Sequence, residues 1–282
     1  MQSHTLCDLH SFNILQFKFR PDSSMSTPMP SSAPVQAFVV NLDKSPERLQ
    51  AITQQASAVG LNLTRVPGVL GRAVDPQAEP AVDPTGYAMC HGRRINLNEV
   101  GCYLSHLKAL QAFLDSGAPY GLILEDDAGL PPGYLELIDA LISKNAAWDI
   151  VKLSAFHSGT PLAIEPLGNG FVLSIALSRH MNANNVLYSR GAAQTMLRCL
   201  VPMRLPFDHA LERAWLFGLR LRVVDPSPCP PDTGHASTIA DNRRYHLIWY
   251  KRLPCMVFRL VTELSRLGFG LAHYLRYKLI KV

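Results

Sequence analysis

The chain has 282 residues, of which 48% are hydrophobic and 17% are charged, and its formal net charge is +5. This composition excludes a disordered chain, and the length allows one large core or two modest ones. No apolar stretch reaches the roughly 20 residues that span a bilayer. The six cysteines lack the CxxC spacing of zinc ligands, so we expect a cytoplasmic protein with reduced thiols.

Residues 1–35 are expected to form a disordered extension, because residues 21–34 are rich in Ser, Pro and Met. The first 20 residues have neither the basic leader nor the cleavage site of a signal peptide. Met25, just before the first β-rich run, is an alternative translation start.

The folded part is expected to begin with a strand over 37–42 and a helix that has Ser45 at its N-cap and ends at Gly60. A strand over 63–66 follows, and residues 67–95 are expected to form a long loop because they are rich in Pro, Gly and Asp.

A second helix is expected to start at Asn96, with Glu99 in a capping-box position. Strands and helices then alternate to residue 224. The remaining expected strands cover 120–124, 148–153, 171–177, 185–188 and 219–224, and the remaining helices 134–142, 190–200 and 208–218. This alternation predicts an α/β fold with a mainly parallel sheet flanked by helices, in a single domain over 36–240.

Three carboxylates, Glu125, Asp126 and Asp127, follow the apolar run over 120–124 directly. Acidic groups crowded at the end of a core strand repel one another and lose hydration. A hard cation such as Mg²⁺ or Mn²⁺ removes both costs, and ligands of α/β sheets bind beyond the carboxyl ends of the strands. The alternative interpretation is a solvated acidic turn.

The tail over 241–282 differs from the rest of the chain. From Arg243 onward it has nine Lys or Arg and a single acidic residue, Glu263. Apolar residues share one face of the expected helix, namely Met256, Leu260, Leu264, Leu267 and Leu271. A basic amphipathic helix of this kind suits peripheral contact with an anionic membrane, here the inner face of the cytoplasmic membrane. Packing of the helix on the core is the alternative.

Five segments, in this order, resemble glycosyltransferase family 25, the bacterial lipooligosaccharide transferases related to procollagen galactosyltransferases. The segments begin at Val40-Asn41-Leu42-Asp43, Glu99-Val100-Gly101, Leu122-Ile123-Leu124, Trp148-Asp149-Ile150 and Pro206-Phe207-Asp208. The resemblance covers about residues 36–240 and implies a GT-A type fold that transfers a sugar from a nucleotide donor. Residues 180–188 depart from the family pattern in carrying bulkier polar side chains, which we expect to shape the sugar pocket.

The resemblance implies that Asp127, with help from Glu125, holds the divalent metal. Glu125 and Asp126 would then also reach hydroxyls of the ribose or the sugar. A departing diphosphate needs such positive charge, because the cation stabilises the transition state more than the ground state.

Asn41 and Arg48 are expected to bind the donor. Arg48 lies in the first turn of its helix, where the helix dipole disfavours a cation, so a donor phosphate would compensate it. A salt bridge to Asp43 or Glu47 is the alternative for Arg48, and a strand-end turn role is the alternative for Asn41.

Ser105 and His106 are candidates for donor contacts on the helix that begins at Asn96. Gly101 and Lys108 lie on the same side as Ser105, and Gly101 permits close approach of a backbone. His106 lies on the side of Cys102, so a buried structural histidine is its alternative role.

An inverting transferase needs a base for the acceptor hydroxyl, and Asp208 is the candidate. A helix N-cap is the alternative role for Asp208. His235 is a further candidate metal ligand, with a free loop histidine as the alternative.

These residues predict a metal-dependent, inverting glycosyltransferase that moves galactose from UDP-galactose onto a lipopolysaccharide-type glycan, with no nucleic-acid partner. After UDP-galactose, the donors next expected are UDP-glucose and an N-acetylhexosamine donor. The rival hypotheses are a metal-dependent hydrolase of nucleotide diphosphates and an inactive sugar-binding homologue.

Overall fold

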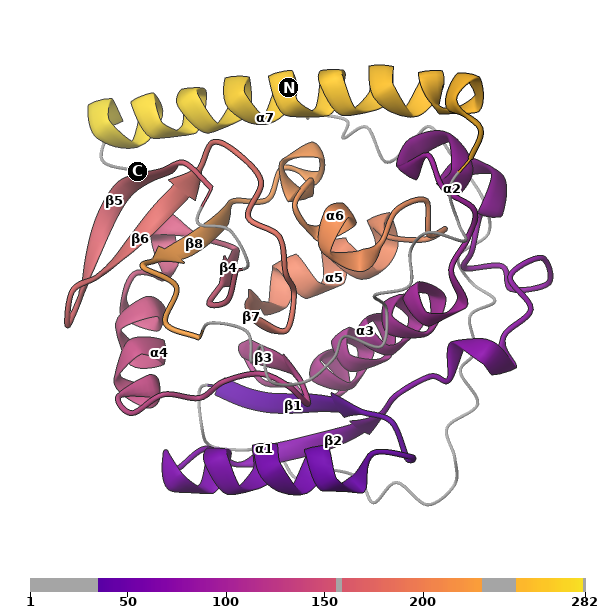
Figure 1. The fold of residues 1–282 in the computed structure, drawn as a ribbon. Helices are drawn as coiled ribbons and strands as arrows, with labels where there is room; N and C mark the ends of the chain where they lie inside the picture. The colour runs from indigo at the N-terminus through magenta and orange to yellow at the C-terminus, as the bar shows by residue number, and fades with distance from the viewer. Residues whose placement is uncertain (1–34, 156–158, 230–246, 281–282) are drawn as a thin grey trace.

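The computed structural model describes residues 35–155, 159–229 and 247–280, which form one eight-stranded sheet covered by helices (Figure 1). The strands are β1 (Val35–Asn41), β2 (Leu63–Pro67), β3 (Tyr120–Glu125), β4 (Ile150–Lys152), β5 (Pro161–Gly168), β6 (Phe171–Ala176), β7 (Asn185–Ser189) and β8 (Leu221–Asp225). The α-helices are α1 (Pro46–Ala58), α2 (Pro84–His91), α3 (Leu97–Asp115), α4 (Tyr134–Ser143), α5 (Arg190–Cys199), α6 (Phe207–Leu211) and α7 (Leu253–Ile280). The expected α/β class, with a sheet flanked by helices and a C-terminal helix, is confirmed.

The strand order is β2-β1-β3-β7-β4-β8-β6-β5. The pairs β1–β2, β1–β3 and β4–β8 are parallel, and the other four are antiparallel. The sheet is therefore mixed and not mainly parallel as the alternation predicts. Strand direction depends on where each strand inserts, and β7 inserts between β3 and β4 in the opposite direction, which no local pattern encodes.

Each face of the sheet has its own hydrophobic core, because successive strand residues point to opposite faces. Phe38 and Ile123 pack with the side chains of α3 and α5 on one face. Val39 and Leu124 pack with α1 and α4 on the other. The fold is thus three layers, with the central strands buried on both sides.

The expected loop over 67–95 contains regular structure. Residues 67–95 include a 3-10 turn, Gly71–Ala73, and helix α2. Helix α2 carries standard end signals: the Asp83 side chain accepts a hydrogen bond from the Gly86 N–H at 2.7 Å, and Gly92 has a φ of 76°. The long-loop expectation is therefore wrong, because Pro and Gly here mark the ends of a helix.

The hairpin β5–β6 adds strands at the far edge of the sheet, where β5 was not expected. Prolines in β5 are tolerated at an edge, since an edge strand needs fewer backbone donors. The turn between the strands uses Gly168, Asn169 and Gly170, all with positive φ. The helix expected over 208–218 is instead α6 followed by a 3-10 turn, Ala214–Phe217.

Helix α7 runs along one edge of the molecule from α2 to β5 (Figure 1). Among the residues that the structure describes, no helix has the length and apolar character needed to cross a membrane. The expected extension over 1–35, except Val35, and the domain boundary at 240 lie outside the described residues, so this domain division stays a prediction.

Candidate active site

Strands β1 and β3 are parallel neighbours, so their carboxyl ends meet at one edge of the sheet. Val40 pairs with Glu125 in this register, which brings Asn41 next to the acidic triplet. The Asn41 amide donates to Asp126 Oδ2 at 2.8 Å and to the Ser45 carbonyl at 2.9 Å. Asn41 therefore ties the start of α1 to the end of β3.

Arg48 reaches the same carboxylates from the first turn of α1. Its guanidinium lies 2.6 Å from Asp126 Oδ1 and 2.9 Å from Asp127 Oδ2. Arg48 therefore pairs with Asp126 and Asp127 and not with Asp43 or Glu47, which was the expected alternative. Arg65 from β2 pairs with Asp43 instead, because Arg65 is the cation that lies beside the end of β1.

Asp127 carries an unsatisfied acidic oxygen. Its Oδ1 is buried and has no hydrogen-bond partner among the described residues. Burial and the nearby charge of Glu125 raise the pKa of Asp127, although Arg48 and the Asn184 amide oppose that rise. Burial likewise raises the pKa of Asp126 against the effects of Asn41 and Arg48. A buried carboxylate oxygen without a donor, in a surplus of negative charge, fits a hard cation.

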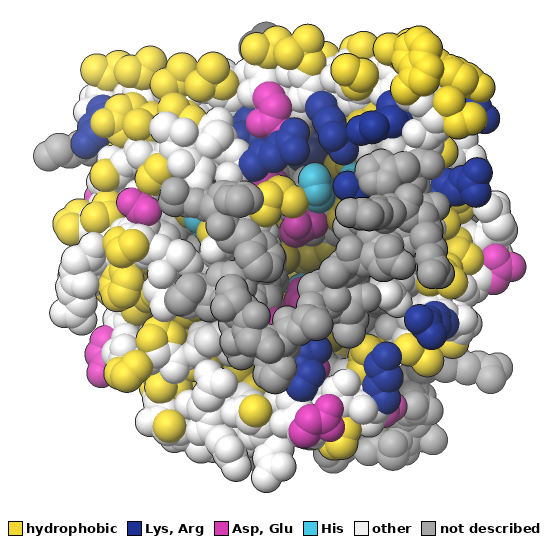
Figure 2. All heavy atoms as spheres, in the orientation of Figure 1, with side chains coloured by type: hydrophobic (Ala, Val, Ile, Leu, Met, Phe, Trp, Pro, Cys, Tyr) yellow, Lys and Arg dark blue, Asp and Glu magenta, His cyan; other side chains and the backbone are white. Residues whose placement is uncertain are grey.

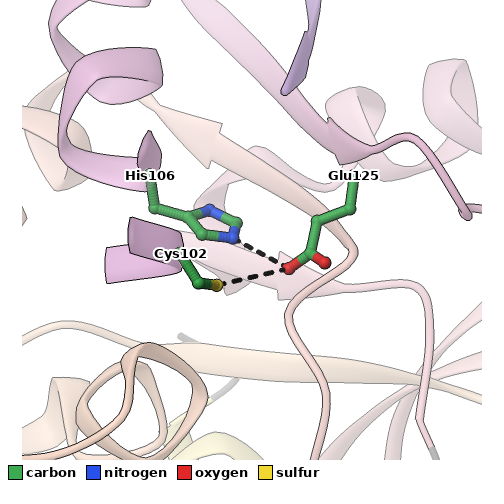
Figure 3. A group of neighbouring side chains, drawn as sticks. All are labelled: Cys102, His106 and Glu125. Carbon is green, nitrogen blue, oxygen red and sulfur yellow. Dashed lines mark hydrogen bonds and ion pairs between the residues drawn. The ribbon is translucent and has the colours of Figure 1, made fainter. Parts of the chain in front are cut away.

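Glu125 points the other way, toward α3 (Figure 3). Its Oε1 lies 3.0 Å from His106 Nε2 and 3.9 Å from Cys102 Sγ. Burial raises the pKa of Glu125, but the bond and charge of His106, together with Arg48, bring it below the ordinary value. The triplet is therefore divided: Glu125 is anchored inward, while Asp126 and Asp127 face Arg48.

His106 is fully buried and stacks on Phe207 with ring centroids 4.0 Å apart. The Cys102, His106 and Glu125 ligand atoms all lie within 4.8 Å of one another, close enough to share a cation. Burial raises the pKa of Cys102 well above its ordinary value, and Glu125 and Asp208 raise it further. Cys102 is thus a neutral thiol, and the structural role of His106, to hold Glu125 in place, has direct geometric support.

Ser105 is engaged within the protein. Its Oγ accepts the Val69 N–H at 2.7 Å and donates to the Gly101 carbonyl at 2.6 Å. Gly101 allows this loop to approach, because a Cβ there would lie 2.7 Å from the Gly71 nitrogen. Both residues bring the segment after β2 against α3. The backbone that approaches Gly101 closely is therefore the protein's own loop after β2.

Asp208 lies in the first turn of α6, which begins at Phe207 and has Pro206, not Asp208, at its N-cap. Its Oδ1 accepts the His209 N–H at 2.9 Å. The preceding residue, Phe207, stacks on His106, and the Asp208 charge contributes to the raised pKa of Cys102. Asp208 therefore lies on the α3 side of the triplet. His235 lies outside the described residues.

Residues 180–185 also lie at this site, within the segment 180–188 that was expected from its sequence to shape the sugar pocket. The Asn184 carbonyl accepts the Glu125 N–H at 2.8 Å, and the Asn184 amide acts on the pKa of Asp127. Asn182, with a φ of 119°, accepts the Asn184 N–H at 3.0 Å and shapes the turn. The run of asparagines was the sequence signal for that expectation.

Comparison with known proteins finds similarity to one family of glycosyltransferases over the N-terminal part of the described chain. Residues 35–161 match the model of "Glycosyltransferase family 25 (LPS biosynthesis protein)". A "Glycosyltransferase 25 family member" of Drosophila pseudoobscura pseudoobscura is 26% identical over 126 residues, which are 43% of this chain and 20% of that protein. A protein of the same description from Aedes aegypti is 25% identical over 121 residues, which are 40% of this chain and 20% of that protein.

This chain therefore spans 20% of the length of these curated relatives. Among solved structures, mannose-1-phosphate geranyltransferase from Thermus thermophilus matches with a TM-score of 0.33 and 13% identity, over 68% of this chain and 74% of that one. The segment that matches the family model contains Asn41, Arg48 and the whole acidic triplet. The chain is therefore similar to glycosyltransferase family 25 over residues 35–161.

Proposed function

We propose that this protein is an inverting glycosyltransferase of GT-A type that moves a hexose, most favourably galactose from UDP-galactose, onto a lipopolysaccharide-type glycan. The observation that carries the proposal is the unpartnered, buried Oδ1 of Asp127 beside Arg48 at the carboxyl edge of β1 and β3. This combination of a free acidic oxygen and a guanidinium suits a nucleotide diphosphate with its cation.

The residues fit a divalent metal, Mn²⁺ or Mg²⁺. Asp127, with its unpartnered Oδ1, would hold it, and Glu125, although its Oε1 is anchored toward α3, would assist because neither contact described above uses its Oε2. A bound cation supplies positive charge for the departing diphosphate.

The protein groups have distinct roles in the proposed reaction. Arg48 and Asn41 orient the acidic pair and the donor. The acceptor hydroxyl oxygen forms a bond to the anomeric carbon as the bond from that carbon to the UDP oxygen breaks. Asp208 takes the proton of the hydroxyl, a contribution of typically about 10²–10⁴-fold for a positioned base. Neighbouring Asn184 would border the sugar.

The test is release of UDP from a panel of UDP-sugars, with a lipopolysaccharide-derived acceptor, in Mn²⁺ and then in chelator. We expect one preferred donor, dependence on the cation, and loss of turnover in Asp127→Asn. Asp139→Asn, an exposed carboxylate on α4, is the matched control and should keep full activity.

Other outcomes would contradict the proposal. Release of UMP or of sugar phosphate would identify a hydrolase. Chelator-sensitive donor binding with no release of UDP from any donor–acceptor pair would favour an inactive sugar-binding homologue. Full activity of Asp127→Asn would remove Asp127 from the metal site.

A further inference from the structure

Helix α7 packs on the core through its charged side. Arg266 donates to the buried Glu212 of the segment after α6 at 2.7 Å. Glu263 accepts from Arg179 at 2.7 Å, and Arg259 donates to the His91 carbonyl at 3.0 Å. The polar residues of this amphipathic helix therefore hold it to the protein.

Two small residues allow α7 to lie close to the core. A Cβ at Gly270 would meet Leu177 at 2.6 Å, and Cys255 is buried against Gly92. The helix is therefore fixed along its length: at α2 near its start, at Glu212 in its middle, and by the Tyr277 hydroxyl, which donates to Glu165 of β5, near its end.

The opposite side of α7 is apolar and uncovered by the described residues. Its exposed side chains range from 40% accessible at Leu271 to 82% at Leu279. They recur at helical spacing along the whole helix and comprise Leu253, Met256, Val257, Leu260, Val261, Leu264, Leu267, Leu271, Leu275 and Leu279. Figure 2 shows them as a hydrophobic edge, with Lys and Arg side chains beneath it. An apolar face of this extent marks an interaction surface.

The charges around this face are positive. Lys251 precedes the helix, and Arg276 and Lys278 lie near its end, all exposed. The one acidic residue of α7, Glu263, is bound to Arg179 and Arg266. Trp249, with 73% of its surface accessible, lies at the start of the helix, a position typical of side chains at a membrane interface.

These charges distinguish between two partners. If two copies packed along α7 in antiparallel fashion, Lys251 of one copy would meet Arg276 and Lys278 of the other, and like charges would repel. In a parallel pair, each cation would face its own counterpart. An anionic lipid surface complements the apolar face and the flanking cations together.

We propose that α7 lies in the interface of an anionic lipid bilayer, with the face from Leu253 to Leu279 inserted among the acyl chains. The helix, of about 42 Å at 1.5 Å per residue for its 28 residues, lies parallel to the membrane plane. Insertion does not depend on the transferase activity.

A consequence for the acceptor does rest on the proposed function. Arg266 binds Glu212, which follows α6 directly, and Asp208 is the second residue of α6, after Phe207. The candidate base is therefore attached to the same side of the molecule as the lipid-facing helix. A glycolipid acceptor would present its sugar to a site held at the bilayer surface.

The experiment is flotation of the full chain with vesicles of phosphatidylglycerol and phosphatidylethanolamine, compared with phosphatidylcholine vesicles. We expect binding to the anionic vesicles, and a loss of about tenfold or more in the double variant Leu260→Gln/Leu264→Gln, because two inserted side chains become polar. The matched control is Leu70→Gln/Val201→Gln, which changes two exposed apolar residues outside α7 and should bind as the unmodified protein does.

Two further measurements complete the test. Trp249 emission should shift to the blue on addition of anionic vesicles, and Arg276→Gln/Lys278→Gln should reduce the preference for anionic over neutral lipid. Equal flotation of Leu260→Gln/Leu264→Gln and unmodified protein would overturn the proposal. So would a lack of binding by the unmodified protein, or a concentration-dependent dimer that only this double variant abolishes.

Release of UDP from the UDP-sugar, measured with a water-soluble acceptor, should be unchanged in the variant, so failure of membrane binding and failure of transfer are distinguishable.

Discussion

Arg48 and Asp127 form an ion pair of 2.9 Å across the gap between the first turn of α1 and the end of β3. The pair leaves Asp127 Oδ1 buried without a hydrogen-bond partner among the described residues. One carboxylate therefore has one oxygen that is neutralised by the protein and one that is available to a ligand.

Arg48→Gln should lower turnover by about 10²-fold, because it removes a fixed positive charge at the proposed diphosphate site. Arg48 lowers the pKa of both Asp126 and Asp127, so its loss lets both pKa values rise. The acid limb of the pH–rate profile should then move to higher pH. Arg48→Lys should restore part of the activity, and Arg198→Gln, an exposed arginine of α5, is the control. An unshifted profile would contradict this assignment.

Asp127→Asn should raise the thermal midpoint of unfolding in chelator at pH 7. The pKa of Asp127 in the fold lies above its ordinary value because of burial and Glu125. A group whose pKa is raised by folding contributes stability at low pH, where it is protonated. This contribution is lost as pH rises through the folded-state pKa, so the ionised carboxylate of Asp127 lowers the free energy of unfolding at neutral pH. Calorimetry at pH 7 measures the difference in thermal midpoint between the variant and the unmodified protein. This difference should become smaller at acidic pH. A lower midpoint at pH 7 would refute the prediction.

Ser105→Ala should destabilise the fold by about 1–3 kcal/mol, because the Val69 N–H loses its acceptor. A donor-binding role would instead raise the KM for the donor without changing stability. Urea unfolding, combined with donor titration, separates the two roles. Ser143→Ala, whose exposed hydroxyl caps its own helix end, is the control.

Asp208→Asn should lower kcat by about 10²–10⁴-fold while donor affinity stays unchanged, since a general base acts only on the acceptor. Calorimetric titration of UDP with Mn²⁺ measures the affinity, and single-turnover kinetics measures the transfer step. Asp115→Asn, at the exposed end of α3, serves for comparison. A variant with wild-type kcat would require another base.

Glu212→Gln should cost about 3–5 kcal/mol of stability at pH 7, because Lys152 and Arg266 would stay buried without their anion. Burial raises the pKa of Glu212, but Lys152 and Arg266 lower it to about 2, below the ordinary 4.5. A depressed pKa stabilises the fold above the unfolded-state value, so this contribution should be lost as pH falls from about 4.5 toward 2.

Urea unfolding of the Glu212→Gln variant and the unmodified protein across that range of pH gives the difference directly. Glu136→Gln, exposed on α4, should show no such difference. If the free energy of unfolding fell equally with pH in the Glu212 variant and the unmodified protein, the pH dependence would come from the titration of another group.

The sequence by itself determined the features that depend on local chemistry. The run over 120–124 is a buried strand because its residues are apolar, and Asn96 is the N-cap of α3 because its side chain accepts the Asn98 N–H. The spacing of Leu260 and Leu264 also predicted that they share a face.

Only the tertiary structure decided which groups meet. Arg48 binds Asp126 and Asp127 instead of its neighbours in sequence, since the register of β1 on β3 sets its distance to them. The division of the triplet depends on His106, which reaches Glu125 only through the packing of α3 on the sheet. Likewise, periodicity gives the two faces of α7 but not which one meets the core. The buried carboxylate of Glu212 decides that, because Arg266 must approach it for the charge to be paired.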